Sequence, residues 1–121
     1  MNRKESAVDP GCIFCKIIAG EIPAQFVHRD DDIAVIVDVN AQAPKHVLIM
    51  PIKHVANLPA FVQRESPEAL AKFLSACGNV GAEQGHNGFR VVFNTGIDGG
   101  QTVDHLHAHV LAGRHLTWPP G

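Results

Sequence analysis

A chain of 121 residues, 45% of them hydrophobic, is long enough for one domain with a hydrophobic core and too short for two. Its net charge of −2 and its scattered basic residues argue against a nucleic-acid or membrane partner. The apolar runs are shorter than the roughly 20 residues that span a bilayer. The first residues are polar and lack the apolar core of a signal peptide, so we expect a cytoplasmic protein.

The N-terminal half of the chain predicts a short helix followed by strands. Residues 1–11 are expected to form a flexible arm, and residues 12–121 a single domain. The apolar spacing of the segment CIFCKII predicts a short helix that ends at Gly20. Three runs rich in β-branched residues predict strands, of which the first two form a hairpin, at residues 24–30, 32–39 and 46–54.

One long helix is predicted after a helical turn at residues 57–61. Ser66 suits the N-cap, Pro67 suits the first helical position, and Glu68 favours the helix dipole. Gly85 can end the helix. The apolar rhythm predicts one buried face, formed by Leu70, Phe73, Leu74, Cys77 and Gly81.

The C-terminal part is predicted to contain a strand at 89–94, a glycine-rich loop at 95–102, a last strand at 104–113 and a tail. Strands and helices do not alternate strictly along the chain. This order favours an α+β domain in which an antiparallel sheet carries its helices on one face.

The stretch DHLHAHVL places histidines at every second position, 105, 107 and 109. In a strand they would share one face, about 7 Å apart, and Leu106, Ala108 and Val110 would share the other. The loop NTGIDGGQT comes just before, and glycines let backbone N–H groups approach a phosphate closely. An imidazole can attack phosphorus, donate a proton or hold an anionic oxygen. The pattern therefore indicates a phosphate site.

The segments PKHVLIMPIKH, RVVFNTGIDGGQTVDHLHAHVLAGR and WPPG resemble the histidine triad (HIT) superfamily, especially its Hint branch of nucleotide-binding phosphoramidases. The resemblance extends from Cys12 to Gly121. It implies a five-stranded antiparallel sheet with two helices, and a homodimer that joins two sheets into one of ten strands. It also implies a hydrolase acting on P–N bonds, which converts purine nucleoside 5′-phosphoramidates to nucleoside monophosphates through a nucleotidyl-histidine. No cofactor would be needed for catalysis.

The same resemblance implies roles for particular residues. His107 would be the nucleophile, and His109 would contact a phosphate oxygen and support proton transfer. His46 would lie beside them, and the hydroxyl of Thr102 would serve the phosphate. The remaining nucleotide-binding residues would be Ile13, Phe14 and Ile17 in the purine slot, Asp38 and Val39 at the ribose, Asn94, Gly100 and Gln101 at the phosphate, and Trp118 at the partner's active site.

A second constellation predicts a metal site. Cys12-x-x-Cys15 has the spacing of zinc ligands, and His54 and His105 are candidates for the other two positions of a tetrahedron. Some bacterial-type members of the superfamily bind structural zinc with this set, so the resemblance implies the same ligands here. The alternative is a partly buried thiol pair without metal.

Two other functions remain open from the sequence. One is a dinucleoside polyphosphate hydrolase or nucleotidyl transferase of the same superfamily. The other is a non-catalytic nucleotide-binding partner protein. The short chain and the WPPG tail favour the phosphoramidase over the transferases.

Overall fold

The computed structural model describes residues 9–121, so most of the predicted N-terminal arm lies outside the described residues. The described chain forms five strands and three helices. The strands are β1 (Phe26–Arg29), β2 (Ile33–Val37), β3 (Lys45–Pro51), β4 (Phe89–Phe93) and β5 (Ala108–Ala112). The helices are α2 (Ile13–Ile18), α3 (Leu58–Arg64) and α4 (Pro67–Gln84).

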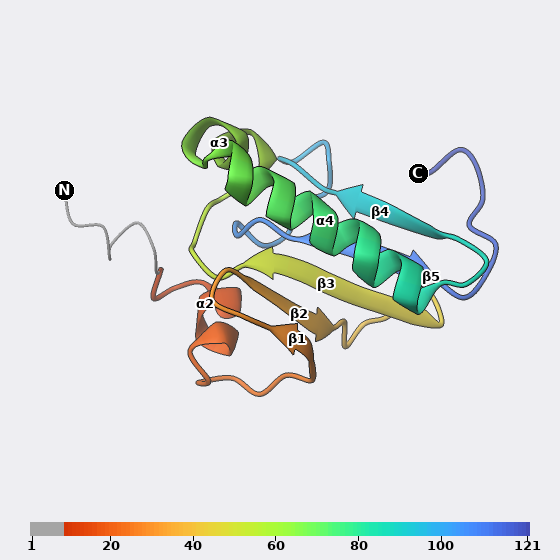
Figure 1. Ribbon diagram of the computed structural model, residues 1–121, viewed down its shortest axis with the longest axis horizontal. Coiled ribbons are helices and arrows are strands. Elements are labelled where there is room, and N and C mark those ends of the chain that lie inside the picture. The colour runs from red at the N-terminus through yellow and green to blue at the C-terminus, as the bar shows by residue number, and fades with distance from the viewer. Residues whose placement is uncertain (1–8) are drawn as a thin grey trace.

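The five strands form a single antiparallel sheet in the order β1-β2-β3-β5-β4. Strand β3 lies at its centre, and β5 is inserted between β3 and β4 (Figure 1). The predicted α+β class and the five-stranded antiparallel sheet are confirmed. β4 is an edge strand, and the last histidine of the triad lies on its neighbour β5.

The helices cover both faces of the sheet, so the prediction of helices on one face was wrong. Helix α4 lies across one face, and α2 packs against the other (Figure 1). The period-two alternation of the central strands explains this arrangement. Val35, Val47 and Ile49 belong to the α4 side of the core, and Ile36, Leu48 and Met50 to the α2 side. Two buried faces need a helix on each.

The turn predicted at residues 57–61 is a complete short helix, α3, so the described chain has three helices where two were expected. The Asn57 side chain caps it by accepting a hydrogen bond from the Ala60 N–H. Ser66 caps α4 as predicted, by accepting from Ala69 N–H. The predicted buried face was wrong at Leu74, which is 67% exposed, while Val80 is buried instead.

The last strand begins at Ala108, four residues later than predicted. Its ladder with β3 ends where Ala108 faces Ile49. β3 ends at Pro51, which has no N–H to donate. The preceding segment bonds elsewhere: the N–H of Leu106 donates to the carbonyl of Val55 in the loop after β3 (2.7 Å).

Within residues 9–121, no helix combines the length and apolar content that a membrane span requires.

Two glycines of α4 provide a matched test of this packing. A Cβ at Gly81 would overlap the Phe89 ring on β4, whereas a Cβ at Gly78 would meet no atom within 4 Å. We expect Gly81→Ala to lower the free energy of unfolding by about 1–3 kcal/mol, because the clash outweighs the gain in helix propensity. Gly78→Ala should raise it by about 0.5–1 kcal/mol. Urea unfolding measures both, and equal effects would contradict the packing of α4 on β4.

Candidate nucleotide and metal sites

The three histidines point to the α2 side of the sheet, although only His109 lies in a strand. The residues between them, Leu106, Ala108 and Val110, are buried on the α4 side. The predicted alternation of faces is therefore confirmed, even where no ladder continues. His105 is completely buried, His107 is 6% exposed, and the His109 side chain is 23% exposed. Solvent thus reaches the cluster at its His109 end.

A backbone carbonyl fixes the proton of His107. Its Nδ1 lies 2.8 Å from the carbonyl oxygen of His105, which can only accept, so Nδ1 carries the proton and donates. The neutral ring then keeps a lone pair on Nε2, so this nitrogen can act as a nucleophile. The ring of Phe14 on α2 packs edge to face against it, with centroids 5.0 Å apart. Helix α2 therefore helps to hold the orientation of this imidazole.

A second chain of bonds fixes His46 and His109. The backbone N–H of Gln42 donates to His46 Nδ1 (2.9 Å), so the neutral ring carries its proton on Nε2. That Nε2 donates to His109 Nδ1 (2.9 Å), with Asp38 Oδ2 at 3.3 Å from the same nitrogen. His109 must therefore carry its own proton on Nε2. The cluster presents a lone pair on one imidazole and an N–H donor on a neighbouring imidazole.

His109 stays neutral near pH 7. Burial, reinforced by the neighbouring His107 and His46, lowers its pKa from 6.5 to about 4. Asp38 opposes this shift only weakly, from 4.0 Å. A neutral ring with its proton on Nε2 can donate a hydrogen bond to an anionic oxygen without carrying a charge of its own.

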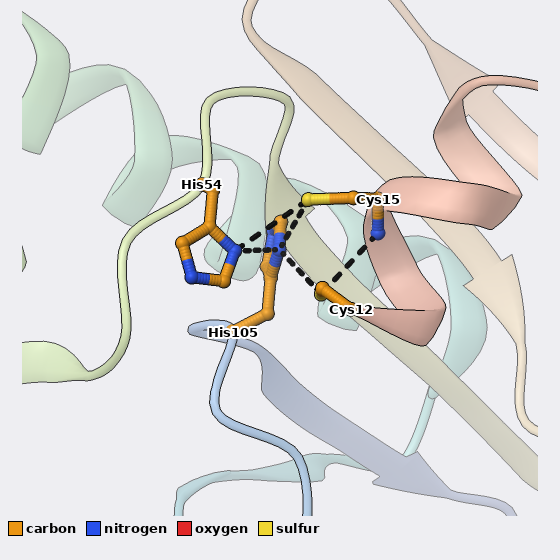
Figure 2. A group of neighbouring side chains, drawn as sticks. All are labelled: Cys12, Cys15, His54 and His105. Carbon is orange, nitrogen blue, oxygen red and sulfur yellow. Dashed lines mark hydrogen bonds between the residues drawn. The ribbon is translucent and has the colours of Figure 1, made fainter. Parts of the chain in front are cut away.

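The four predicted metal ligands converge. Figure 2 shows Cys12, the N-cap residue of α2, and Cys15 of α2 facing His54 and His105. His105 Nδ1 lies 3.4 Å from Cys12 Sγ and 3.6 Å from Cys15 Sγ. His54 Nδ1 lies 3.5 Å from Cys15 Sγ and 3.2 Å from His105 Nδ1. The cluster joins α2, the loop after β3 and the segment before β5.

These distances match the edges of a zinc tetrahedron. Bonds of usual length to nitrogen and sulfur give edges of about 3.3 Å between nitrogens and about 3.5 Å between nitrogen and sulfur. The tautomer of His105 also fits, because its Nε2 donates to the carbonyl of Pro51 (2.9 Å) and leaves a lone pair on Nδ1. Burial lowers the pKa of His105 to about 4, which keeps this ring neutral. The donor set therefore fits a tetrahedral metal ion.

A second group, Asp38, His46 and His109, also brings its ligand atoms within 4.8 Å of one another. Its hydrogen bonds argue against a metal there. Because Gln42 N–H occupies His46 Nδ1, the ring must keep its proton on Nε2, the nitrogen that would have to bind the ion. The proton positions thus distinguish this proton-donating group from the Cys12, Cys15, His54 and His105 group, whose donor atoms are free to bind a metal ion.

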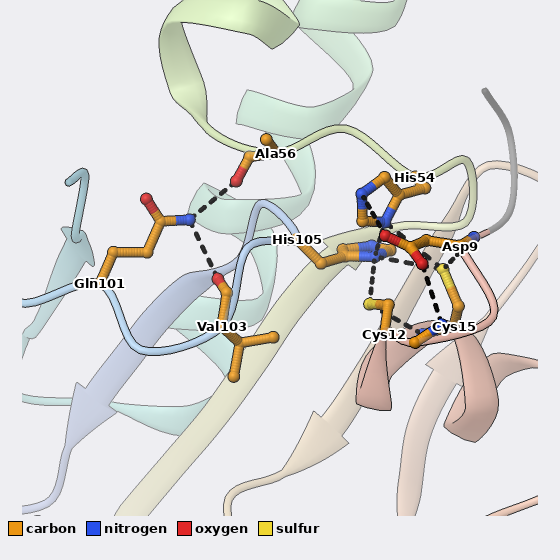
Figure 3. Close-up of polar contacts among 9 residues, drawn as sticks. Asp9, Cys12, Cys15, His54, Ala56, Gln101, Val103 and His105 are labelled. Carbon is orange, nitrogen blue, oxygen red and sulfur yellow. Dashed lines mark hydrogen bonds and ion pairs between the residues drawn. The ribbon is translucent and has the colours of Figure 1, made fainter.

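Sequence reasoning missed Asp9, which borders the metal cluster. Its N–H donates to Cys15 Sγ (3.4 Å), and its Oδ2 lies 3.8 Å from His54 Nε2 (Figure 3). A carboxylate behind a ligating histidine typically orients that ring. The residue lies in the segment expected to be a loose arm, so the spacing of its neighbours gave no signal. The backbone groups of Gln42 and Pro51 were missed because no residue type reports them.

The glycine-rich loop is held by its own polar side chains. Gln101 Nε2 donates to the carbonyls of Ala56 and Val103 (Figure 3). Its Oε1 accepts from Gly96 N–H. Asn94 donates to the carbonyl of Gly99, where a Cβ would overlap the backbone of Thr95. The predicted phosphate-side residues therefore gather in one loop, in which Gly100 has a φ of +77°. The side-chain amide of Gln101 therefore stabilises the conformation of this loop.

The structure does not bring every predicted nucleotide-binding residue to one place. Phe14 and Ile17 are buried in the α2 side of the core, while Ile13 is 45% exposed. Val39 next to Asp38 is 99% exposed, and Thr102 is also exposed. Trp118 is 81% exposed on the tail. Within the described single chain, no aromatic contact joins Trp118 to the histidines.

Two surface cavities lie away from the triad. One, of about 680 Å³, lies between α2, α3 and the start of α4, and it touches the metal cluster only at Cys15. The other, of about 740 Å³, lies at the opposite end of the sheet and includes Lys45, Arg90 and Arg114. Neither is lined by a histidine of the triad. The triad meets solvent at the partly exposed His109, beside Asp38.

The HIT domain family matches residues 19–116, which include the whole triad. An HIT-like protein of Synechococcus elongatus is 46% identical over 110 residues, covering 90% of this chain and 96% of that protein. A 14 kDa zinc-binding protein of Zea mays is 39% identical, covering 99% of this chain and 98% of that protein. The crystal structure of an HIT family hydrolase from Legionella pneumophila superimposes with a TM-score of 0.85 at 44% identity, covering 92% of this chain and all of that one. The chain therefore belongs to the HIT domain family.

Proposed function

We propose that this protein is a Hint-type phosphoramidase, which hydrolyses purine nucleoside 5′-phosphoramidates to nucleoside monophosphates. The observation that carries the proposal is the pair of fixed tautomers. His107 offers a lone pair on Nε2, and His109 offers a proton on Nε2. Their ring centroids are 5.1 Å apart, so one phosphoryl group can contact both. The hydrolase name of the Legionella relative supports the reaction class.

In the proposed first step, His107 Nε2 attacks the α-phosphorus and the P–N bond breaks. The amine leaves with a proton drawn from solvent, and the nucleotide stays attached to His107. His109 Nε2–H would stabilise charge on a phosphoryl oxygen, together with backbone N–H groups of the loop around Gly100. Water then attacks the phosphorus and releases a proton to solvent, the bond between phosphorus and Nε2 breaks, and His107 is regenerated. No metal takes part in these steps.

The proposed nucleotide contacts lie on the α2 side of the sheet, where the histidines also lie. Asp38 accepts one bond from Asn40 N–H and lies near His46, and a carboxylate has lone pairs left for the ribose hydroxyls. The purine would lie along α2, where Phe14 already contacts His107. The residues proposed at the rest of the site are Ile13, Ile17 and Val39 at the nucleoside, Asn94, Gln101 and Thr102 at the phosphate, and Trp118 at the leaving group.

His107→Ala should abolish turnover of an adenosine 5′-phosphoramidate, because no other imidazole of the cluster offers a free Nε2 lone pair. The folded variant should still bind AMP, as followed by calorimetry. Release of AMP by the variant at the wild-type rate would refute the nucleophile assignment. Binding without turnover by the wild type would favour a nucleotide-binding partner protein. Faster cleavage of a diadenosine polyphosphate would favour the polyphosphate hydrolase.

We also propose a structural zinc ion bound by Cys12, Cys15, His54 and His105. The distances within the cluster and the name of the maize relative support it. With four protein ligands, the ion would supply a crosslink and no open position for chemistry. It would tie α2, which contacts His107 through Phe14, to the segment that precedes β5.

Protein purified without chelator should contain about one zinc per chain by elemental analysis. Cys15→Ser should lose the metal and lower the melting temperature, because it removes a ligand. Cys77→Ala is the matched control, since this third thiol is buried in the α4 side of the core and should leave the zinc content unchanged. A wild type that is purified without metal and melts at the same temperature with and without added zinc would contradict the zinc proposal.

We further propose a homodimer in which two sheets join through their β4 strands. β4 is an edge strand of the described sheet, and one side of an edge backbone stays free to pair with another chain. Pairing would extend five strands to ten and bring the tail with Trp118 toward the partner. Light scattering after gel filtration should give twice the mass of one chain. The mass of a single chain at micromolar concentration would refute the dimer.

A further inference from the structure

Arg114, just after β5, contacts a loop that the reaction scheme has not used. Its Nη2 donates to the carbonyl of Gln42 (2.9 Å), and its Nη1 donates to the carbonyl of His115 (3.1 Å). Gln42 lies in the exposed loop between β2 and β3. The other side-chain bonds described for this loop are internal to residues 38–46. Arg114 therefore ties the loop to the far end of β5.

The tied residue is the one whose N–H sets the proton on His46. Without Gln42 N–H on Nδ1, the His46 ring could move its proton to Nδ1. Its Nε2 would then accept, and His109 would have to move its own proton to Nδ1 to keep the 2.9 Å bond between them. That change would leave His109 with a lone pair, and no donor, toward a phosphoryl oxygen. The Gln42 N–H on Nδ1 and the Asp38 carboxylate, 3.3 Å from Nε2, thus act together on His46 and so on what His109 presents to the ligand.

We propose that Arg114 is a positioning residue, which holds Gln42 so that its N–H fixes the tautomers of His46 and His109. Arg114 would affect the chemistry only through Gln42, because its guanidinium touches neither the triad nor a substrate. Its consequence for catalysis rests on the proposed function, whereas its consequence for the tautomers does not. Arg114 lines the 740 Å³ cavity at the end of the sheet, and His46 is not part of that lining.

The direct test is ¹⁵N–¹H correlation of the imidazole rings in protein labelled with ¹⁵N-histidine, recorded near pH 7.5. The wild type should show both His46 and His109 with the proton on Nε2. Arg114→Ala should populate the Nδ1–H form of both rings, and Gln42→Pro, which lacks the N–H altogether, should populate it further. Gln42→Ala keeps both backbone groups and should give the wild-type spectrum. Arg64→Ala, at the exposed end of α3, controls for the loss of one positive charge.

In the phosphoramidate assay, Arg114→Ala should lower kcat by about three- to tenfold, the factor expected for one exposed hydrogen bond, with a smaller change in KM. Arg114→Lys, which keeps a donor, should recover part of the loss. Arg64→Ala should leave both parameters unchanged.

The spectra and the assay separate the two proposals. Inactive wild-type protein whose His46 and His109 respond to Arg114→Ala would refute the phosphoramidase and retain the positioning role. A wild type with the proton on His46 Nδ1 would overturn the positioning role at any activity. Unchanged rings in folded Arg114→Ala would overturn it as well. If Arg114→Ala does not fold, unchanged rings in Gln42→Pro would overturn it instead, because that variant removes the N–H through which Arg114 would act.

Discussion

Backbone groups decide which nitrogen of each functional histidine carries its proton, and the site depends on this constraint. The carbonyls of Pro51 and His105 accept from His105 and His107, and the N–H of Gln42 donates to His46. A backbone carbonyl can only accept and a backbone N–H can only donate, so these bonds leave no choice of tautomer. Similar imidazoles are thereby suited to the three different proposed roles of metal ligand, nucleophile and hydrogen-bond donor.

His105 contacts both the candidate metal site and the candidate nucleotide site. Its ring faces the two thiols and His54, while its carbonyl oxygen orients the ring of His107 two residues later. Phe14, between the two cysteines on α2, touches the rings of both His105 and His107. A change in the metal cluster would therefore reach the nucleophile through a backbone bond and through ring packing. Through this proximity, the proposed zinc ion would influence the proposed turnover without having an open position of its own.

The sequence predicted what depends on residue type and local spacing. The caps of α4, the two faces of the triad and the four converging ligands all follow from short-range patterns. The sequence did not predict the features that depend on residues distant in the chain. The strand start at Ala108 depends on where β3 stops, and the position of α2 depends on the two buried faces of the central strands. The bond from Gln42 N–H to His46 was not predicted, because a backbone amide has no signature in a sequence, and the bond from Arg114 to Gln42 joins residues 72 positions apart.

The most direct test of the account is the site of the covalent intermediate. A turnover mixture of the wild type with an adenosine phosphoramidate, quenched within the first cycles, should yield a peptide with adenylate on His107. The ³¹P spectrum of the adduct should identify Nε2 as the bonded nitrogen, because Nδ1 donates to the carbonyl of His105. An adduct on Nδ1 or on another histidine, or turnover that never forms an adduct, would contradict the account.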